Sequence, residues 1–180
     1  DWLRVHRPHL VANGSALSNP GDDGQLLFAL PYRDQLVRVL QRVLDDNEFL
    51  SPFGVRSLSR YHEDHPYTFY ADGVGYSVGY EPGESRSNLF GGNSNWRGPI
   101  WFPINSLLVD ALRSHAAGAH EDHVVEFPTG SGRMVGLDVV ADDLDERLIG
   151  LFRVGPGGRA PATPRDHPSG PLWDVHPTFS

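Results

Sequence analysis

The spacing of apolar side chains predicts three helices separated by irregular segments. In residues 32–48 apolar side chains recur at three- and four-residue intervals, which places them on one helix face, with Arg38 and Arg42 opposite. A second helix is expected to begin near Pro103, because proline fits the first turn. A third is expected over residues 138–152. The predicted core-facing positions are Leu36, Val37, Leu40, Val43 and Leu44; Ile104, Leu107, Leu108, Ala111 and Leu112; and Val140, Leu144, Leu148, Ile149 and Phe152.

Two other segments depart from the helical pattern. Residues 124–127 and 133–135 flank a Pro-Thr-Gly-Ser-Gly turn, which predicts a small β-hairpin. From residue 51 to residue 102 regular periodicity disappears, and segments of this kind are usually either functional or disordered. Within it, residues 61–102 hold 10 of the chain's 19 aromatic residues. Because disordered linkers are poor in aromatics, we expect an ordered, functional loop.

Composition narrows the choice of partners. The 180 residues are enough for one domain, and the net charge of −8 argues against a nucleic-acid-binding surface. There is no cysteine, which excludes disulfides, thiolate metal sites and cysteine nucleophiles. No apolar run is long enough to span a bilayer. We therefore expect no nucleic-acid partner, no membrane partner and a cytoplasmic location, with which the lack of cysteine is compatible.

Residues 80–101 carry the densest candidate chemistry, and their composition suits a neutral sugar. An indole ring can lie against the C–H face of a pyranose, asparagine amides and the arginine fork can bond its hydroxyls, and glycines let the backbone approach. The alternative is structural, since a tryptophan beside Gly-Pro often fills space at a helix start and Arg97 could cap a neighbouring helix. The candidate substrate-binding residues are Glu84, Asn93, Asn95, Trp96, Arg97 and Trp101.

The run Trp-Arg-Gly-Pro-Ile-Trp at residues 96–101 resembles a block of glycoside hydrolase family 63, the processing α-glucosidases (mannosyl-oligosaccharide glucosidases) and their bacterial relatives. The resemblance covers roughly residues 2–155, and residues 47–56 and 81–85 are similar to a bacterial branch. It implies an all-α fold, a partial (α/α)6 toroid with long functional loops and a small β-hairpin. Residues 1–155 would belong to the catalytic domain, and residues 156–180 would form an irregular, truncated tail.

The same resemblance implies inverting cleavage of an α-glucosidic or related α-glycosidic bond, without a cofactor. In the family the general acid lies upstream, and the general base lies in a Glu-Tyr block near the C-terminus. No glutamate follows Glu146 here. We therefore expect a C-terminal fragment that is inactive by itself, and we assign no catalytic residue. The expected partners are an α-glucoside or oligosaccharide and the remainder of the catalytic domain, since three helices cannot close a toroid and would leave apolar faces exposed.

Three alternatives accompany this hypothesis. Glu81 and Glu84 could form a catalytic pair if mutual repulsion raised one pKa, although loop carboxylates more often accept hydrogen bonds. A non-catalytic carbohydrate-binding domain is the alternative from another functional class. A metal site is not expected, because neither histidine cluster has the spacing of a helical metal site. These clusters are His62 and His65 with Glu63 and Asp64, and His115 with His120 and His123.

Overall fold

The structure is a computed structural model that describes residues 2–8, 33–81, 98–118, 124–155, 158 and 160–162. Its helices are α1 (Trp2–His6), α3 (Arg33–Val43), α4 (Phe102–Gly118) and α5 (Leu137–Gly150), with a 3-10 turn η2 (Arg60–Glu63). Its strands are β1 (Leu50–Ser51), β2 (Gly54–Val55), β3 (Tyr67–Ala71), β4 (Val74–Val78), β5 (Val124–Glu126) and β6 (Met134–Gly136). They pair as three antiparallel hairpins, β1–β2, β3–β4 and β5–β6.

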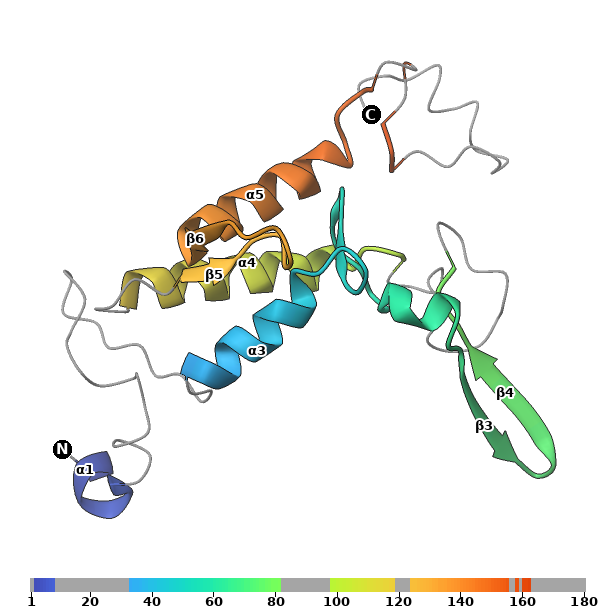
Figure 1. The fold of residues 1–180 in the computed structure, drawn as a ribbon, viewed down its shortest axis with the longest axis horizontal. Helices are drawn as coiled ribbons and strands as arrows, with labels where there is room; N and C mark the ends of the chain where they lie inside the picture. Colours follow the sequence, from blue (N-terminus) through green and yellow to red (C-terminus); the bar gives the residue numbers. More distant parts are fainter. Residues whose placement is uncertain are drawn as a thin grey trace.

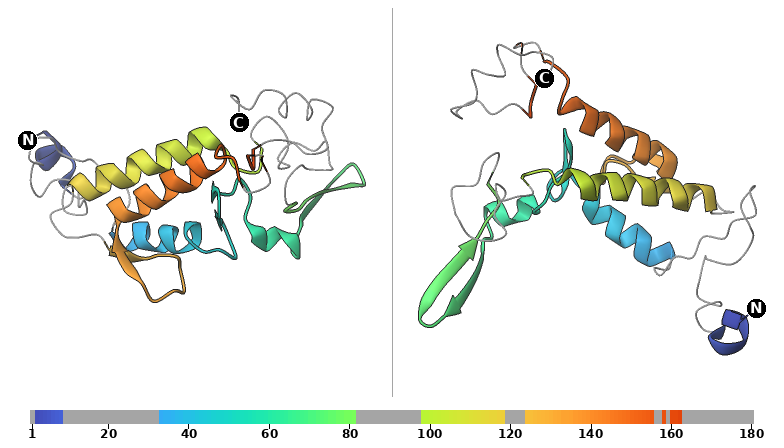
Figure 2. Two further views of the ribbon diagram at one scale, coloured as in Figure 1. Left: turned by 90° about the horizontal axis from the view of Figure 1, so that it is seen from above. Right: turned by 180° about the vertical axis from the view of Figure 1, so that it is seen from behind.

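Helices α3, α4 and α5 and the β5–β6 hairpin enclose one hydrophobic core, and the β3–β4 hairpin projects away from it (Figure 1). Helices α4 and α5 lie side by side, with α3 nearby in both further views (Figure 2). Arg113 on α4 bonds to Asp142 and Asp145 on α5 at 3.0 and 2.6 Å. The buried core residues are Leu40, Leu44, Leu50, Val109, Leu112, Val125, Phe127, Leu137, Val140, Ala141, Leu144 and Leu148.

The three predicted helices are present, because their apolar periodicity matches the faces that they bury. Leu40 on α3 and Leu44 directly after it are buried, and the side chain of Arg38 is exposed, as predicted. The predicted inner faces of the other two helices are partly wrong, since Leu107 on α4 and Ile149 on α5 are exposed. Among the residues that the structure describes, no helix is long and apolar enough to cross a membrane.

The predicted all-α fold is wrong for this chain. Three β-hairpins lie among the described residues, and helices α3, α4 and α5 pack with one of them rather than forming a sector of an (α/α)6 toroid. The described part of the chain is an α+β arrangement. Local turn chemistry explains the difference, because short antiparallel strands need only a compatible turn and a partner.

The β3–β4 hairpin lies inside the segment predicted to be an irregular loop. Its strands are joined by Asp72 and Gly73, which have φ angles of 52° and 78°. Two consecutive positive φ values define the type I′ turn, whose twist matches that of the flanking strands and which favours Asp-Gly. The β5–β6 hairpin lies where the sequence predicted it, with Val125 opposite Val135.

Two leucine substitutions distinguish the core from the exposed helix face. Leu144 is 0% exposed and Leu107 is 63% exposed. We predict that Leu144→Ala lowers the free energy of unfolding of this chain by about 2–5 kcal/mol, because it leaves a cavity. Leu107→Ala should change it by less than about 0.5 kcal/mol. Urea denaturation of both variants checks this, and equal losses would show that the core is placed wrongly.

Candidate functional site

The predicted sugar-binding loop is described at its two ends. Residues 80–81 and 98–101 are described, whereas residues 82–97 lie outside the described residues. Trp101 is therefore the one predicted substrate-binding residue that the structure places. The other five lie outside the described residues: Glu84, Asn93, Asn95, Trp96 and Arg97.

The C-terminal end of the loop is attached to the chain just after strand β2. The Ser57 hydroxyl donates to the carbonyl of Gly98 at 2.8 Å, and the Ser57 N–H donates to the carbonyl of Pro99 at 2.8 Å. Arg56 forms an antiparallel β-bridge with Ile100, which packs against the hydrophobic core. This end of the loop is thereby joined to the β1–β2 hairpin by backbone pairing.

The N-terminal end of the loop reaches the same arginine. The N–H of Tyr80 donates to the carbonyl of His62 at 3.1 Å, and the Arg56 guanidinium lies 5.8 Å from the centre of the Tyr80 ring. This is within the range of a cation–π contact. The guanidinium also donates to the carbonyls of Leu50 and, at 3.1 Å, Asp46. Arg56 therefore contacts both ends of the loop while its own position is held by the turn after α3.

Trp101 leads directly into α4, where Asn105 holds it. The Trp101 carbonyl accepts from the backbone N–H and the side-chain Nδ2 of Asn105, both at 3.1 Å. Asn105 is 3% exposed, and its amide also bonds both backbone groups of Val55. Its Oδ1 accepts from the Val55 N–H at 2.7 Å, and its Nδ2 donates to the Val55 carbonyl at 3.0 Å. One buried amide thus joins the start of α4 to strand β2.

Gly54 makes this close approach possible. It has a φ angle of 111°, a conformation that favours glycine. A Cβ atom at this position would lie 2.9 Å from Asn105 Oδ1 and 3.0 Å from Leu148 Cδ2. Strand β2 can therefore lie against both α4 and α5 only with glycine at this position.

Glu48 joins α3 to the segment that follows the β1–β2 hairpin. Its Oε2 accepts from the Ser59 hydroxyl at 2.5 Å, its other oxygen pairs with Arg42, and its carbonyl accepts from the Arg60 N–H at 2.9 Å. The hydrogen bond from Ser59, with Arg42 beside it, holds the pKa of Glu48 below its ordinary value of 4.5. Since a general acid needs a raised pKa, this carboxylate suits a structural role.

The remaining carboxylates and histidines near the loop take part in local contacts. Glu63 pairs with Arg60 at 3.2 Å, and Glu81 is half-buried at the N-terminal end of the loop. His62 and His65 each make a ring-nitrogen contact with a nearby carbonyl in the turn around η2. Within the described ranges, no group of three or more His, Cys, Asp or Glu side chains could hold a metal ion. The Glu81–Glu84 pair is not tested, because Glu84 lies outside those ranges.

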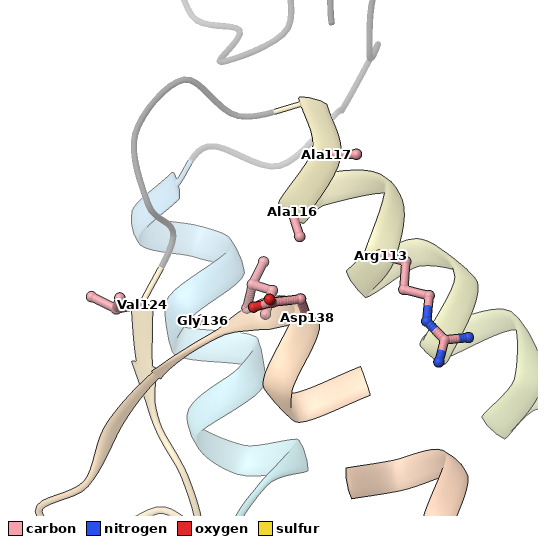
Figure 3. A pocket seen from close by; sticks show the side chains of 7 residues that line it. Arg113, Ala116, Ala117, Val124, Gly136 and Asp138 are labelled. Atoms are coloured by element: carbon pink, nitrogen blue, oxygen red, sulfur yellow. The ribbon is translucent and has the colours of Figure 1, made fainter. Parts of the chain in front are cut away.

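A shallow depression of about 530 Å³ lies at the far end of α4 (Figure 3). Ala116 and Ala117 line it from α4, Gly136 lines it from the end of β6, and Asp138 lines it from the start of α5. Ala116 lies thirteen positions after Pro103 along α4, which corresponds to roughly 20 Å of helix. The depression is therefore remote from the loop ends and forms no part of the candidate site.

Sequence reasoning missed two residues that organise the site, Arg56 and Asn105. Arg56 ends the run at residues 47–56 that supported the family resemblance, and Asn105 follows Trp101 by four residues. A polar residue at a position where a helix should be apolar was the available signal for Asn105. No local signal reveals its partner Val55, which is 50 residues away in the chain.

Comparison with known proteins assigns the family. Residues 25–145 match the model of the mannosylglycerate hydrolase MGH1-like glycoside hydrolase domain. The chain is 47% identical over 153 residues to the uncharacterized protein YMR196W of Saccharomyces cerevisiae, covering 84% of this chain and 14% of the yeast protein. No solved structure matches the chain. The matches confirm the prediction of a glycoside hydrolase family, and the chain spans about one seventh of the yeast relative.

The Asn105 amide can be tested with an isosteric substitution. Asn105→Asp replaces the two-donor Nδ2 with an acceptor and leaves the carbonyls of Val55 and Trp101 without that donor. We predict a loss of about 2–3 kcal/mol in the free energy of unfolding, the cost of unsatisfied buried groups. Asn47→Asp, on an exposed side chain, is the matched control and should change stability by less than about 0.5 kcal/mol. Equal urea midpoints for the two variants would contradict the role of Asn105.

The lowered pKa of Glu48 predicts that the free energy of unfolding falls at acidic pH. The pKa of Glu48 lies below 4.5 in the folded chain. As the pH falls, Glu48 is therefore protonated at a higher pH in the unfolded chain than in the folded chain. The stability that Glu48 contributes is present above pH 4.5 and is lost as the pH falls through its folded pKa. Unfolding free energies measured between neutral and acidic pH should fall less steeply for Glu48→Gln than for the unmodified chain. Some decline should remain, since backbone N–H groups of Gly130 and Gly132 also lower the pKa of Glu126. Identical pH profiles would refute the assignment.

Proposed function

The chain belongs to the MGH1-like glycoside hydrolase family, and from that premise we propose that it supplies the sugar-binding loop of an inverting enzyme that cleaves an α-glucosidic or related α-glycosidic bond. The observation that carries the proposal is the attachment of both loop ends to Arg56, through the Tyr80 ring and through the bridge to Ile100. Fixing both ends of a loop lowers the entropic cost of binding a ligand with it. The proposed substrate-binding residues are Glu84, Asn93, Asn95, Trp96, Arg97 and Trp101.

The chemical step needs carboxyl groups beyond those described. An inverting hydrolase places its two carboxyls roughly 6.5–9.5 Å apart, so that a water molecule fits between the base and the sugar. Glu48 is held as a carboxylate by Ser59 and Arg42, and Glu63 is engaged by Arg60. We therefore place the general acid and the general base on other segments of a longer enzyme, and we propose that this chain by itself is inactive and needs no cofactor.

The surface of α4 supports a larger catalytic domain as the partner of this segment. Asn105, Val109 and Leu112 face the core, yet Ile104 and Leu107 on the opposite side are 47% and 63% exposed. A helix that is apolar on both sides is typical of the interior of a large protein. We propose that the remainder of the catalytic domain covers Ile104 and Leu107. The yeast relative, of which the chain spans 14%, is long enough to provide it.

The proposal also covers the domain boundaries, the cellular location and the branch of the family. We propose that residues 1–155 belong to the catalytic domain, that residues 156–180 form an irregular tail, and that the protein is cytoplasmic. The family match at residues 25–145 lies within the first of these segments. Kinship with the bacterial branch of glycoside hydrolase family 63 is likewise proposed, on the Trp-Arg-Gly-Pro-Ile-Trp run.

A second candidate substrate comes from the family's own description, which includes mannosylglycerate hydrolase. The loop composition suits glucose and mannose units equally, because both present a C–H face and hydroxyl groups to aromatic and amide side chains. A non-catalytic carbohydrate-binding role is the alternative in which the whole protein releases no sugar.

Sugar release and sugar binding separate these possibilities. We predict that this chain, at high concentration, releases no free sugar from α-glucosides or from mannosylglycerate, but binds methyl α-glucoside weakly. Trp96→Ala should abolish this binding, whereas Trp2→Ala, which removes a tryptophan that is 63% exposed on α1, should leave it unchanged. Saturation-transfer difference NMR measures the binding, and a coupled assay measures the release.

Release that exceeds one sugar per chain and is lost in Glu81→Gln or Glu84→Gln would show that the catalytic pair lies in this chain. Unchanged binding by Trp96→Ala would refute the proposed role of the loop. The corresponding yeast protein should release sugar from one of the two substrate classes if the proposal is correct, and from neither if the family member is a binding protein.

A further inference from the structure

The β3–β4 hairpin has two chemically different faces. It projects from the rest of the described chain (Figure 1), and residues on both faces are exposed, with Phe69 46% and Tyr70 78% exposed. Its register places Phe69 opposite Tyr76 on one face, and Thr68 opposite Ser77 and Tyr70 opposite Gly75 on the other face, because side chains alternate along a strand.

The first face is a stack of aromatic rings that stiffens the hairpin. The Tyr67 and Phe69 rings are 6.4 Å apart, and the Phe69 and Tyr76 rings are 5.2 Å apart, each pair within about 25° of parallel. Phe69 and Tyr76 lie on opposite strands, and such cross-strand pairs stabilise an antiparallel ribbon. Together with the type I′ turn at Asp72 and Gly73, they hold the opposite face in a defined shape.

On the opposite face the Tyr70 ring lies close to Gly75 on the neighbouring strand. A Cβ atom built on Gly75 would lie 3.0, 3.4 and 3.6 Å from three atoms of the Tyr70 ring, Cε1, Cδ1 and Cζ. The ring therefore approaches strand β4 at these atoms, and most of its surface is open to solvent, with Tyr70 78% exposed. A side chain at position 75 would crowd this ring, and glycine leaves it room.

Hydroxyl groups lie beside this ring. Thr68 Oγ1 donates to Ser77 Oγ at 3.0 Å, and both side chains are exposed on the Tyr70 face. Neither strand contains a charged residue. The Tyr70 face, which we define as Thr68, Tyr70, Gly75 and Ser77, thus presents one flat ring and two hydroxyls to solvent, which suits a neutral ligand with an apolar face and hydroxyl groups. An anionic partner would require basic side chains that these strands lack.

We propose that the Tyr70 face binds a pyranose unit of an extended oligosaccharide. The ring would stack on the C–H face of the sugar, and Thr68 and Ser77 would bond its hydroxyls. Strand β4 is followed by Gly79 and Tyr80, at the N-terminal end of the proposed sugar loop, and a substrate of several sugar units would engage both places. The inference rests on the proposed function for the ligand class, and it specifies a substrate of several sugar units.

Substitutions on the hairpin test the inference. By saturation-transfer difference NMR, maltotetraose should bind this chain more tightly than methyl α-glucoside. Tyr70→Ala should weaken maltotetraose binding by about tenfold, in line with the loss of one aromatic stack, and should leave methyl α-glucoside unchanged. Tyr70→Trp should retain binding. Gly75→Ala keeps the tyrosine but displaces its ring, and should also weaken maltotetraose binding.

The control is Tyr61→Ala, which removes a tyrosine that is 53% exposed on η2 and should leave both affinities unchanged. If Tyr70→Ala and Gly75→Ala bind maltotetraose like the parent chain while Trp96→Ala does not, the inference fails and the proposed function stands. If only the hairpin variants lose binding, the loop proposal fails and the inference stands. A Tyr70-dependent dimer in sedimentation velocity, without sugar binding, would overturn the inference and identify the face as a protein contact.

Discussion

The side-chain amide of Asn105 bonds to both backbone groups of Val55 and to the carbonyl of Trp101 from a position that is 3% exposed. The amide bonds to the backbone of β2 in the way that a neighbouring strand would, on the edge that does not pair with β1. It also holds Trp101, the residue before α4. Buried amides of this kind stabilise a structure only when every donor and acceptor is matched, and they are costly when one is lost. These hydrogen bonds fix the positions of Gly54, Arg56 and the start of α4 relative to one another.

Several features follow from that contact. Strand β2 lies against α4 and α5, so Arg56, the next residue, meets Ile100 on one side and Tyr80 on the other. Both ends of the proposed sugar loop are thereby attached to the packed helices. On the far side of α4, Ile104 and Leu107 remain exposed, which fits a segment that is covered by the rest of a longer enzyme. The β3–β4 hairpin, which ends two residues before Tyr80, carries an aromatic face.

The sequence predicted the features that depend on local periodicity. Helices α3, α4 and α5 and the β5–β6 hairpin lie where spacing and turn residues placed them, and the glycoside hydrolase family followed from the run at residues 96–101. The all-α fold came from the resemblance and was wrong here, although Asp72-Gly73 between alternating aromatics is a strong hairpin signal. Ile149 and Phe152 have the right helical spacing but are exposed, because spacing does not show how far a packed face extends. The bond between Asn105 and Val55 spans 50 residues, and such a tertiary pairing leaves no local pattern.

Native-state hydrogen exchange at the Val55 amide is the most direct measurement of the central constraint. If the Asn105 amide holds β2 against the helices, the Val55 N–H should exchange only when the core opens, with the same protection as Leu112 in α4 and Leu148 in α5. A Val55 N–H that exchanges through local opening, far faster than these helix amides, would contradict the account.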